Sequence, residues 1–201
     1  MANSVWLTTQ LLTPPKTGSV AVANICRRII DEPFYRIRHH GGPKDFSRYS
    51  IGTIRNPLST YVSLWAFGCE KHGKLWEADI VPKKLYGDAN NIDMFVAWMD
   101  WIFKKYDHLC LTRLYRVCND KIDKIEAWVL QENMRPTLEK ALEKSPAKLV
   151  PDWREQIRER GKAQLNTTKH RPWEEYYDNT LRSKVIDREQ KIFYKFYEQE
   201  M

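Results

Sequence analysis

The sequence has little of several features that mark specialised classes of protein. Its 201 residues include only four cysteines and eight glycines, with no internal repeat and no low-complexity tract. The cysteines form no Cys-x-x-Cys pair, and no spacing with histidine completes a zinc ligand set. Hydrophobic residues make up 42% and charged residues 29%, which argues against intrinsic disorder. We therefore expect a globular protein with buried free thiols and no metal.

Long apolar runs are also missing. No stretch approaches the roughly 20 residues that span a bilayer. The opening residues "MANSVWLTTQ" lack the basic and apolar regions of a secretory signal. These two observations predict no membrane span and a cytoplasmic location.

The chain does carry an excess of positive charge. There are 33 Lys and Arg residues against 26 Asp and Glu, a net charge of +7. Such a balance favours an anionic partner: nucleic acid, an anionic membrane surface, or a phosphorylated or sulfated small molecule. The length allows one domain, residues 1–201, with a core of its own.

Patterning along the chain alternates between strand and helix. Strands are predicted at residues 4–12, 34–40, 49–54 and 124–133, and helices at 19–30, 58–68, 92–106, 135–145 and in the tail. Residues 109–117 fit either a strand or a helix. The alternation predicts an α/β fold with an open, mostly parallel central sheet flanked by helices.

One basic corner follows the first predicted strand, at "PKTGS", residues 15–19. Gly18 allows close approach of the backbone to an anion, the following helix offers N–H groups, and Lys16 adds a charge. Thr17 and Ser19 add hydroxyl groups. By itself the corner also fits a capped helix beside an exposed lysine.

A second basic corner follows the strand at 49–54. Arg55 precedes Pro57, which is well placed at the first turn of a helix, and Ser63 lies two turns inside that helix. An arginine fork with a hydroxyl grips a phosphate well. A solvated arginine beside a helix cap is the alternative. Both corners follow predicted strands, at the edge where open parallel sheets bind ligands.

Taken together, "TPPKTGS" and "IGTIRNPLSTYVSLW" resemble the paired signature of sulfotransferases that use 3′-phosphoadenosine 5′-phosphosulfate. The stretches "KIEAWVLQENMRPTLEKALEK" and "KHRPWEEYYDNTLRSKVIDREQKIFYKFYE" are similar to the carbohydrate branch of that family. The resemblance implies a P-loop-like nucleotide-transferase architecture. It also implies transfer of a sulfuryl group to a hydroxyl or amine of a small-molecule or glycan acceptor, with adenosine 3′,5′-bisphosphate as product and no metal.

The resemblance assigns the 5′-phosphosulfate to the first corner and the 3′-phosphate to the second. The nucleotide-binding residues that it implies are Lys16, Thr17, Gly18, Ser19, Val20, Arg55 and Ser63. Val20 stands where many relatives carry a second hydroxyl, so that contact falls to the backbone or is lost. Lys16 is also implied to be catalytic, because its charge neutralises the leaving phosphate as the S–O bond breaks.

The acceptor needs a base to take its proton. His39 and His40 follow the second predicted strand, in the interval where several relatives place a histidine base. Adjacent strand residues face opposite sides, so one of the two faces the cleft. His40 is favoured because glycines follow it, and Glu70 and His72 are held in reserve.

Late in the chain, the basic stretch "NTTKHRP" resembles a segment that contacts the 3′-phosphate in relatives, which implicates Lys169 and Arg171. A solvated charge run is the alternative for either residue. Two other functions remain open: a basic nucleic-acid-binding protein, and a nucleotide or nucleoside kinase. The missing Gly-x-x-x-x-Gly-Lys pattern counts against the kinase, and the sulfotransferase hypothesis expects no nucleic-acid partner.

Overall fold

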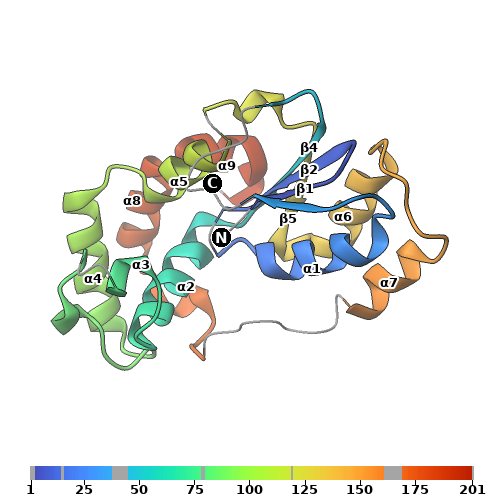
Figure 1. Ribbon diagram of the computed structural model, residues 1–201. Coiled ribbons are helices and arrows are strands. Elements are labelled where there is room, and N and C mark those ends of the chain that lie inside the picture. The colour runs from blue at the N-terminus through green and yellow to red at the C-terminus, as the bar shows by residue number, and fades with distance from the viewer. Residues whose placement is uncertain are drawn as a thin grey trace. The chain divides into compact units, whose positions relative to one another are not determined.

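The computed structural model describes residues 3–14, 16–37, 45–77, 80–118, 120–160 and 169–200 (Figure 1). The chain divides into two compact units, each built from two stretches of sequence. The first unit comprises residues 1–55 and 113–165, and the second comprises 56–112 and 166–201. This division does not test the expectation that residues 1–201 form one domain, which stays a prediction.

The first unit is built on a mixed sheet with strand order β3-β1-β2-β4-β5. Its strands are β1 (Asn3–Val5), β2 (Thr9–Leu12), β3 (Tyr35–Ile37), β4 (Tyr49–Ile54) and β5 (Ala127–Leu130). Parallel pairing joins β2 to β4 and β4 to β5, whereas β1 is antiparallel to both of its neighbours. All strands except β1 therefore run in one direction. The predicted α/β class with a mostly parallel sheet is confirmed in this mixed form.

The prediction of one strand over residues 4–12 is wrong, because this stretch forms the hairpin of β1 and β2. The N–H of Trp6 donates to the carbonyl of Thr9 at 2.8 Å, which closes the turn. The turn contains no Gly, Pro, Asn or Asp, the residues that usually reveal a reversal. Its polar groups are instead satisfied from far along the chain. The Glu32 carboxylate accepts from the N–H of Thr8 at 3.0 Å and from its hydroxyl at 2.8 Å.

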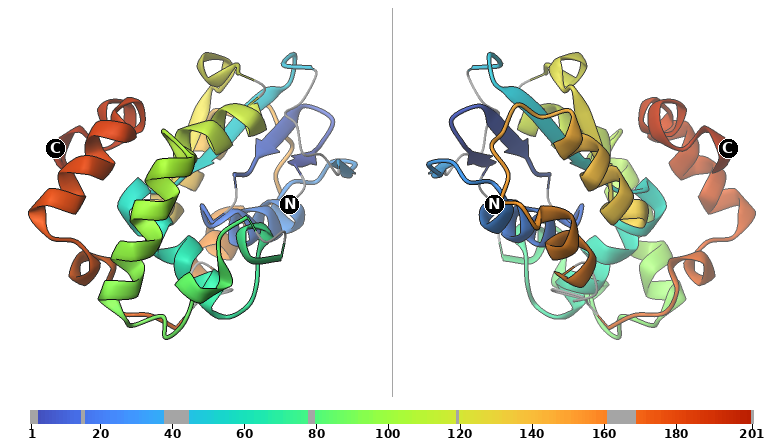
Figure 2. Two further views of the ribbon diagram at one scale, coloured as in Figure 1. Left: turned by 90° about the vertical axis from the view of Figure 1, so that its left-hand side faces the viewer. Right: turned by 90° about the vertical axis from the view of Figure 1, so that its right-hand side faces the viewer.

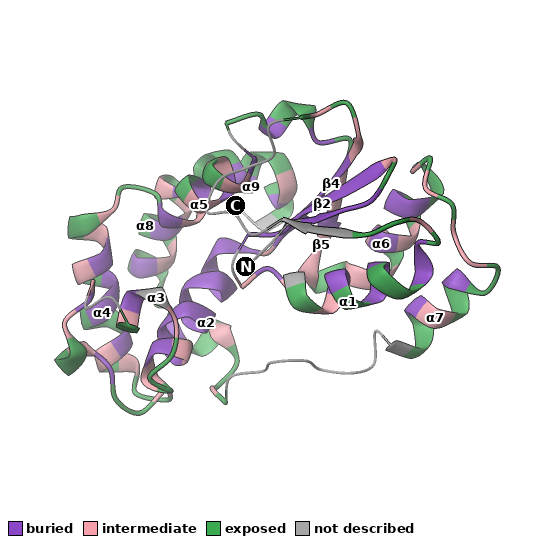
Figure 3. Cartoon of the chain, viewed as in Figure 1, coloured by how far each residue is buried: buried purple, intermediate pink, exposed green. Residues whose placement is uncertain are grey.

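Helices α1 (Ser19–Ile29), α6 (Met134–Glu143) and α7 (Trp153–Arg160) cover one face of this sheet (Figure 1). Helices α1 and α7 lie side by side in both Figure 1 and Figure 2. Strands β2 and β4 are buried along almost their whole length (Figure 3). The core between sheet and helices contains Trp6, Leu11, Val22, Ile25, Ile29, Ile51, Val129, Leu138, Leu142, Trp153 and Ile157.

The second unit is helical. Its elements are α2 (Pro57–Cys69), α3 (Lys74–Glu77), η1 (Lys83–Leu85), α4 (Ile92–Lys105), η4 (Trp173–Tyr176), α8 (Asn179–Arg188), α9 (Gln190–Phe196) and η5 (Glu198–Glu200). Helix α5 (Leu109–Cys118) crosses from the second unit into the first, so the ambiguous stretch at 109–117 is helical. The short 3-10 turns η2 (Ile122–Lys124) and η3 (Gln131–Asn133) flank β5.

An aromatic cluster forms the centre of the second unit. The ring of Phe95 on α4 lies 5.4 Å from Trp65 on α2 and 5.1 Å from Tyr176, measured between centroids. The same ring lies 6.2 Å from Trp98 and 5.4 Å from Tyr177. These rings pack against one another at the centre of the unit, and α2 is buried along most of its length.

The junction of α8 and α9 is fixed by two charged residues. Glu189 is fully buried and accepts from the hydroxyl of Tyr61 at 2.6 Å and from the N–H groups of Cys110 at 2.8 Å and Leu111 at 2.9 Å. Its carboxylate therefore caps the N-terminus of α5. Next to it, Nη1 of Arg188 donates to three carbonyl oxygens at the end of α4, at 3.0–3.2 Å.

Among the helices within the described ranges, none combines the length and the apolar character needed to cross a bilayer.

Candidate functional site

Lys16 and Arg55, one residue from each predicted basic corner, lie at one edge of the sheet in the first unit. Strands β2 and β4 are neighbouring and parallel, so both end at this edge. The loop that contains Lys16 follows β2, and Arg55 follows β4. Nη1 of Arg55 donates to the carbonyl oxygen of Lys16 at 3.4 Å. The fold therefore places an arginine fork directly against the lysine loop.

The loop has an unusual backbone. Lys16 has φ of 67° and Gly18 has φ of 70°, so both are in the left-handed region. For glycine this costs little, but for lysine it costs about 1–2 kcal/mol. Strain of this size persists only where surrounding contacts enforce it, and such residues cluster at functional sites.

Thr17, between these two residues, supplies the main anchor of the loop. Its side chain is buried, and its hydroxyl donates to the carbonyl of Pro14 at 2.8 Å. The same oxygen lies 2.7 Å from the hydroxyl of Thr53 on β4. In this structure the hydroxyl of Thr17 thus holds the loop against the sheet. Its predicted contact with a phosphate stays a prediction.

Helix α1 begins directly after the loop, with Gly18 as its N-cap. A glycine cap contributes no side-chain acceptor to the first turn, and that turn holds no Asp or Glu. The positive end of the helix dipole is consequently not neutralised by an acidic residue of its own first turn, while Arg27 and Arg28 occupy the last turn. This arrangement suits an external anion. Val20, in the first turn, has 42% of its surface exposed.

Gln131, which sequence reasoning missed, completes the edge from the third parallel strand. A Cβ added at Gly18 would lie 3.0 Å from Cγ of Gln131, so only glycine allows this approach without displacement. Within the described part of the chain, Oε1 of Gln131 is buried and finds no hydrogen-bond partner. The predicted strand extended to residue 133 and therefore placed Gln131 inside it, whereas β5 ends at Leu130 and leaves Gln131 at this edge.

Electrostatically, the two units differ. The first contains 20 Lys and Arg against 12 Asp and Glu, a net charge of +8, whereas the second contains 13 against 14, a net charge of −1. The whole positive excess of the protein therefore belongs to the unit that carries Lys16 and Arg55. A field of that sign raises the local concentration of anions.

Ser63 lies on α2, in the second unit, and is buried. Because Arg55 belongs to the first unit, their predicted shared grip on a 3′-phosphate stays a prediction. Lys169 and Arg171 also belong to the second unit. The N–H of Lys169 donates to the Glu70 carboxylate at 3.4 Å, and the guanidinium of Arg171 pairs with Glu175 at 3.4 Å.

The two favoured base candidates, His39 and His40, lie outside the described residues. Strand β3, which ends at Ile37, runs in the same direction as β2 and so ends at the same edge of the sheet. The reserve candidate His72 is exposed in the second unit, with its ring 5.5 Å from that of Phe67. Neither reserve residue belongs to the unit of the lysine loop.

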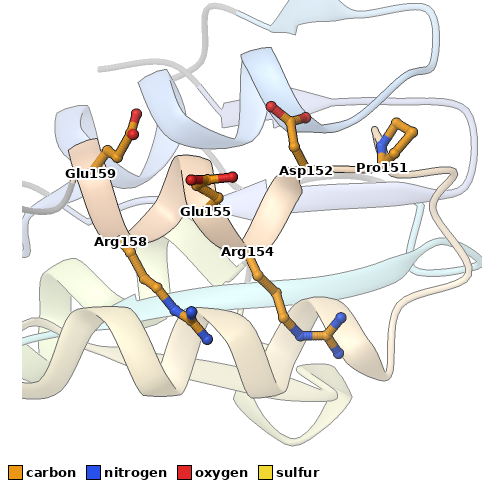
Figure 4. Close-up of a pocket in the computed structure, with 6 residues that line it drawn as sticks. All are labelled: Pro151, Asp152, Arg154, Glu155, Arg158 and Glu159. Atoms are coloured by element: carbon orange, nitrogen blue, oxygen red, sulfur yellow. The ribbon is translucent and has the colours of Figure 1, made fainter.

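A depression of about 520 Å³ lies on α7, lined by Pro151, Asp152, Arg154, Glu155, Arg158 and Glu159 (Figure 4). Its arginines extend toward α6, where Arg154 pairs with Glu143 at 2.8 Å and Arg158 with Glu139 at 3.9 Å. The depression contains none of the predicted site residues. Across the described ranges, His, Cys, Asp and Glu side chains form no group of three that is arranged to hold a metal ion.

Comparisons of the chain with protein-family models, with curated proteins and with solved structures give no match. The function is therefore inferred from the chain's own residues.

Proposed function

We propose that the protein is a sulfotransferase that uses 3′-phosphoadenosine 5′-phosphosulfate and modifies a hydroxyl or amine of a small-molecule or glycan acceptor. The proximity of Lys16 and Arg55 gives this proposal its main support. The lysine loop after β2 and the arginine after β4 resemble two separate nucleotide-binding motifs, and Arg55 contacts the backbone of Lys16 at one edge of one sheet. The positive excess of the first unit and the strained loop support an anionic ligand there.

In this proposal the protein's own groups bind the nucleotide, stabilise the leaving group and accept a proton. Lys16 and the N-terminus of α1 bind the 5′-phosphosulfate, and Arg55 binds the 3′-phosphate. As the acceptor oxygen or nitrogen forms its bond to sulfur, the bond from sulfur to the bridging oxygen breaks and negative charge develops on the departing phosphate. Lys16 stabilises that charge. His39 or His40 accepts the proton of the acceptor.

Binding of adenosine 3′,5′-bisphosphate tests the proposal, with thermal unfolding as the readout. At about 100 times its dissociation constant, a specific ligand adds roughly 2.7 kcal/mol of stability. For a protein of 201 residues this raises Tm by about 5–10 °C. AMP, sulfate, and ATP with magnesium serve as controls. We expect a shift with the bisphosphate that none of these reproduces.

Substitutions test whether the bisphosphate binds at the lysine loop. Lys16→Ala and Arg55→Ala are each expected to abolish the shift and the transfer of labelled sulfuryl to an acceptor. Arg48→Ala is the matched control, because Arg48 precedes the other end of β4 and pairs on the surface with Asp45 at 2.9 Å. A shift with ATP and magnesium alone would favour a kinase. No shift with any nucleotide, together with salt-dependent retention on RNA or DNA, would favour nucleic-acid binding.

A further inference from the structure

We propose that Thr53 and Thr17 form a hydroxyl relay that holds the lysine loop in its anion-binding conformation. This role for Thr53 rests on the proposed function, because it concerns the same site. Thr53 lies on β4 with no exposed surface, and Thr17 is only 4% exposed. Their oxygens are 2.7 Å apart, and the oxygen of Thr17 lies 2.8 Å from the carbonyl oxygen of Pro14. Thr53 would act as a positioning residue that does not itself contact the ligand.

The direction of the relay follows from counting hydrogens. A carbonyl oxygen accepts only, so the single hydroxyl hydrogen of Thr17 is used by Pro14. The 2.7 Å contact with Thr53 then requires that Thr53 donate to Thr17. The chain of donors thus runs from the buried strand, through Thr17, to the start of the loop. Removing the Thr53 hydroxyl would leave a buried acceptor on Thr17 without its donor.

The relay acts where the backbone is strained. Thr17 lies between Lys16 and Gly18, the two residues with positive φ. Fixing the side chain of the middle residue restrains the backbone on both sides, and therefore the position of Lys16 and the start of α1. Without that restraint, Lys16 would relax toward the right-handed region that its side chain prefers.

Strand β4 also restrains the loop a second time. Thr53 and Arg55 are two residues apart, the spacing that places side chains on the same side of an extended chain. Thr53 holds the side chain of Thr17, and Arg55 holds the carbonyl of Lys16. A change in the strand would thus be transmitted to both binding corners at once.

Two substitutions at position 53 separate the effect of the hydroxyl group from the effect of side-chain volume. Thr53→Val keeps the volume and removes the donor, whereas Thr53→Ser keeps the donor. By calorimetry with adenosine 3′,5′-bisphosphate, we expect Thr53→Val to weaken binding at least tenfold, which is about 1.4 kcal/mol. Thr53→Ser should remain within threefold of wild type.

A matched control exists on the neighbouring strand. Thr9 on β2 is equally buried, and its hydroxyl lies 2.6 Å from that of Ser145. Among the described residues, this pair of hydroxyls does not contact the lysine loop. Thr9→Val should destabilise the fold comparably without changing affinity for the bisphosphate. Equal losses of affinity in Thr9→Val and Thr53→Val would overturn the proposal, because they would reflect general destabilisation.

Backbone chemical shifts of Lys16, recorded without ligand, provide a readout that does not depend on the proposed function. Wild type and Thr53→Ser should show a left-handed Lys16, and Thr53→Val should lose it. If Thr53→Val does not fold, the pair Thr17→Val and Thr17→Ser replaces it. A left-handed Lys16 in the valine variant would refute the relay. If wild type binds no bisphosphate, the proposed function fails, and a loss of the left-handed shift in the valine variant would still support the relay.

Discussion

Glu189 offers the sharpest test of how the second unit is held together. Its carboxylate is the shared acceptor for the Tyr61 hydroxyl and for two backbone N–H groups at the start of α5. Glu189→Ala would leave three donors without an acceptor, at about 1–3 kcal/mol each, partly offset because no carboxylate need then be desolvated. Three such losses, reduced by that offset, give an expected cost of about 3–5 kcal/mol.

Thermal and urea unfolding measure this cost directly. For a chain of this length, about 3–5 kcal/mol lowers Tm by roughly 6–20 °C. Asp187→Ala is the control, because Asp187 is exposed near the end of the same helix. Its effect should stay within about 0.5 kcal/mol. If Glu189→Ala melts within about 2 °C of wild type, the carboxylate does not hold α5, and our account of this junction is wrong.

The pH dependence of stability separates the effect of the Glu189 charge from the effect of its hydrogen bonds. Burial raises the pKa of Glu189 above its ordinary 4.5, because loss of solvent outweighs the hydrogen bonds from Tyr61, Cys110 and Leu111. A carboxyl with a raised folded pKa contributes stability that is fully present below the unfolded pKa and is lost as pH rises through the folded pKa. Wild type should therefore gain stability relative to Glu189→Gln as pH falls from neutral toward 4.5. A pH-independent difference would contradict this reasoning.

Three further outcomes are expected. Gly52→Ala should lower the free energy of unfolding by about 1–3 kcal/mol, because the added Cβ would lie 2.4 Å from Cζ3 of Trp128. Urea titration measures this change. Unchanged stability would show that the Trp128 ring moves aside freely. Burial raises the pKa of Cys26 to about 12 and that of Cys69 to about 11. At pH 8 both thiols should react with a disulfide reagent far more slowly than in the unfolded chain, and fast native labelling of Cys26 would contradict its burial. Arg188→Ala should lower the free energy of unfolding by about 1.5–3 kcal/mol, because the Arg188 guanidinium donates to three carbonyls at the end of α4. Thermal unfolding measures this loss, and a Tm equal to that of wild type would refute the role of Arg188.

The parts of the fold that local sequence dictates could be predicted. The strand at 49–54, the helix after Gly18 and the helix that starts at Pro57 all occur where strand propensity, a turn glycine and a proline at the first helical position indicate. The parallel strands then place Lys16 and Arg55 at one edge, which the rule for α/β sheets anticipates.

What could not be predicted depends on contacts distant in sequence. The hairpin turn at 6–8 is satisfied by Glu32, 24 residues beyond Thr8, so no local signal marks it. The internal use of the Thr17 hydroxyl depends on Thr53, 36 residues away. Helical spacing over residues 58–68 predicted the helix but not the extent of its burial: α2 is buried along most of its length, and Trp65 packs against Phe95 of α4, 30 residues away.

The alternation of the two units along the chain has a consequence for biosynthesis. Strands β4 and β5 are paired in register, Ile54 with Leu130, yet the first segment of the second unit is translated between them. A ribosome therefore releases β4 with one edge open and supplies its partner only after the chain has grown well past residue 112. Closing so long a loop slows folding, and the exposed strand edge in the interval invites pairing with other chains. Covering that edge until β5 emerges would suppress such pairing.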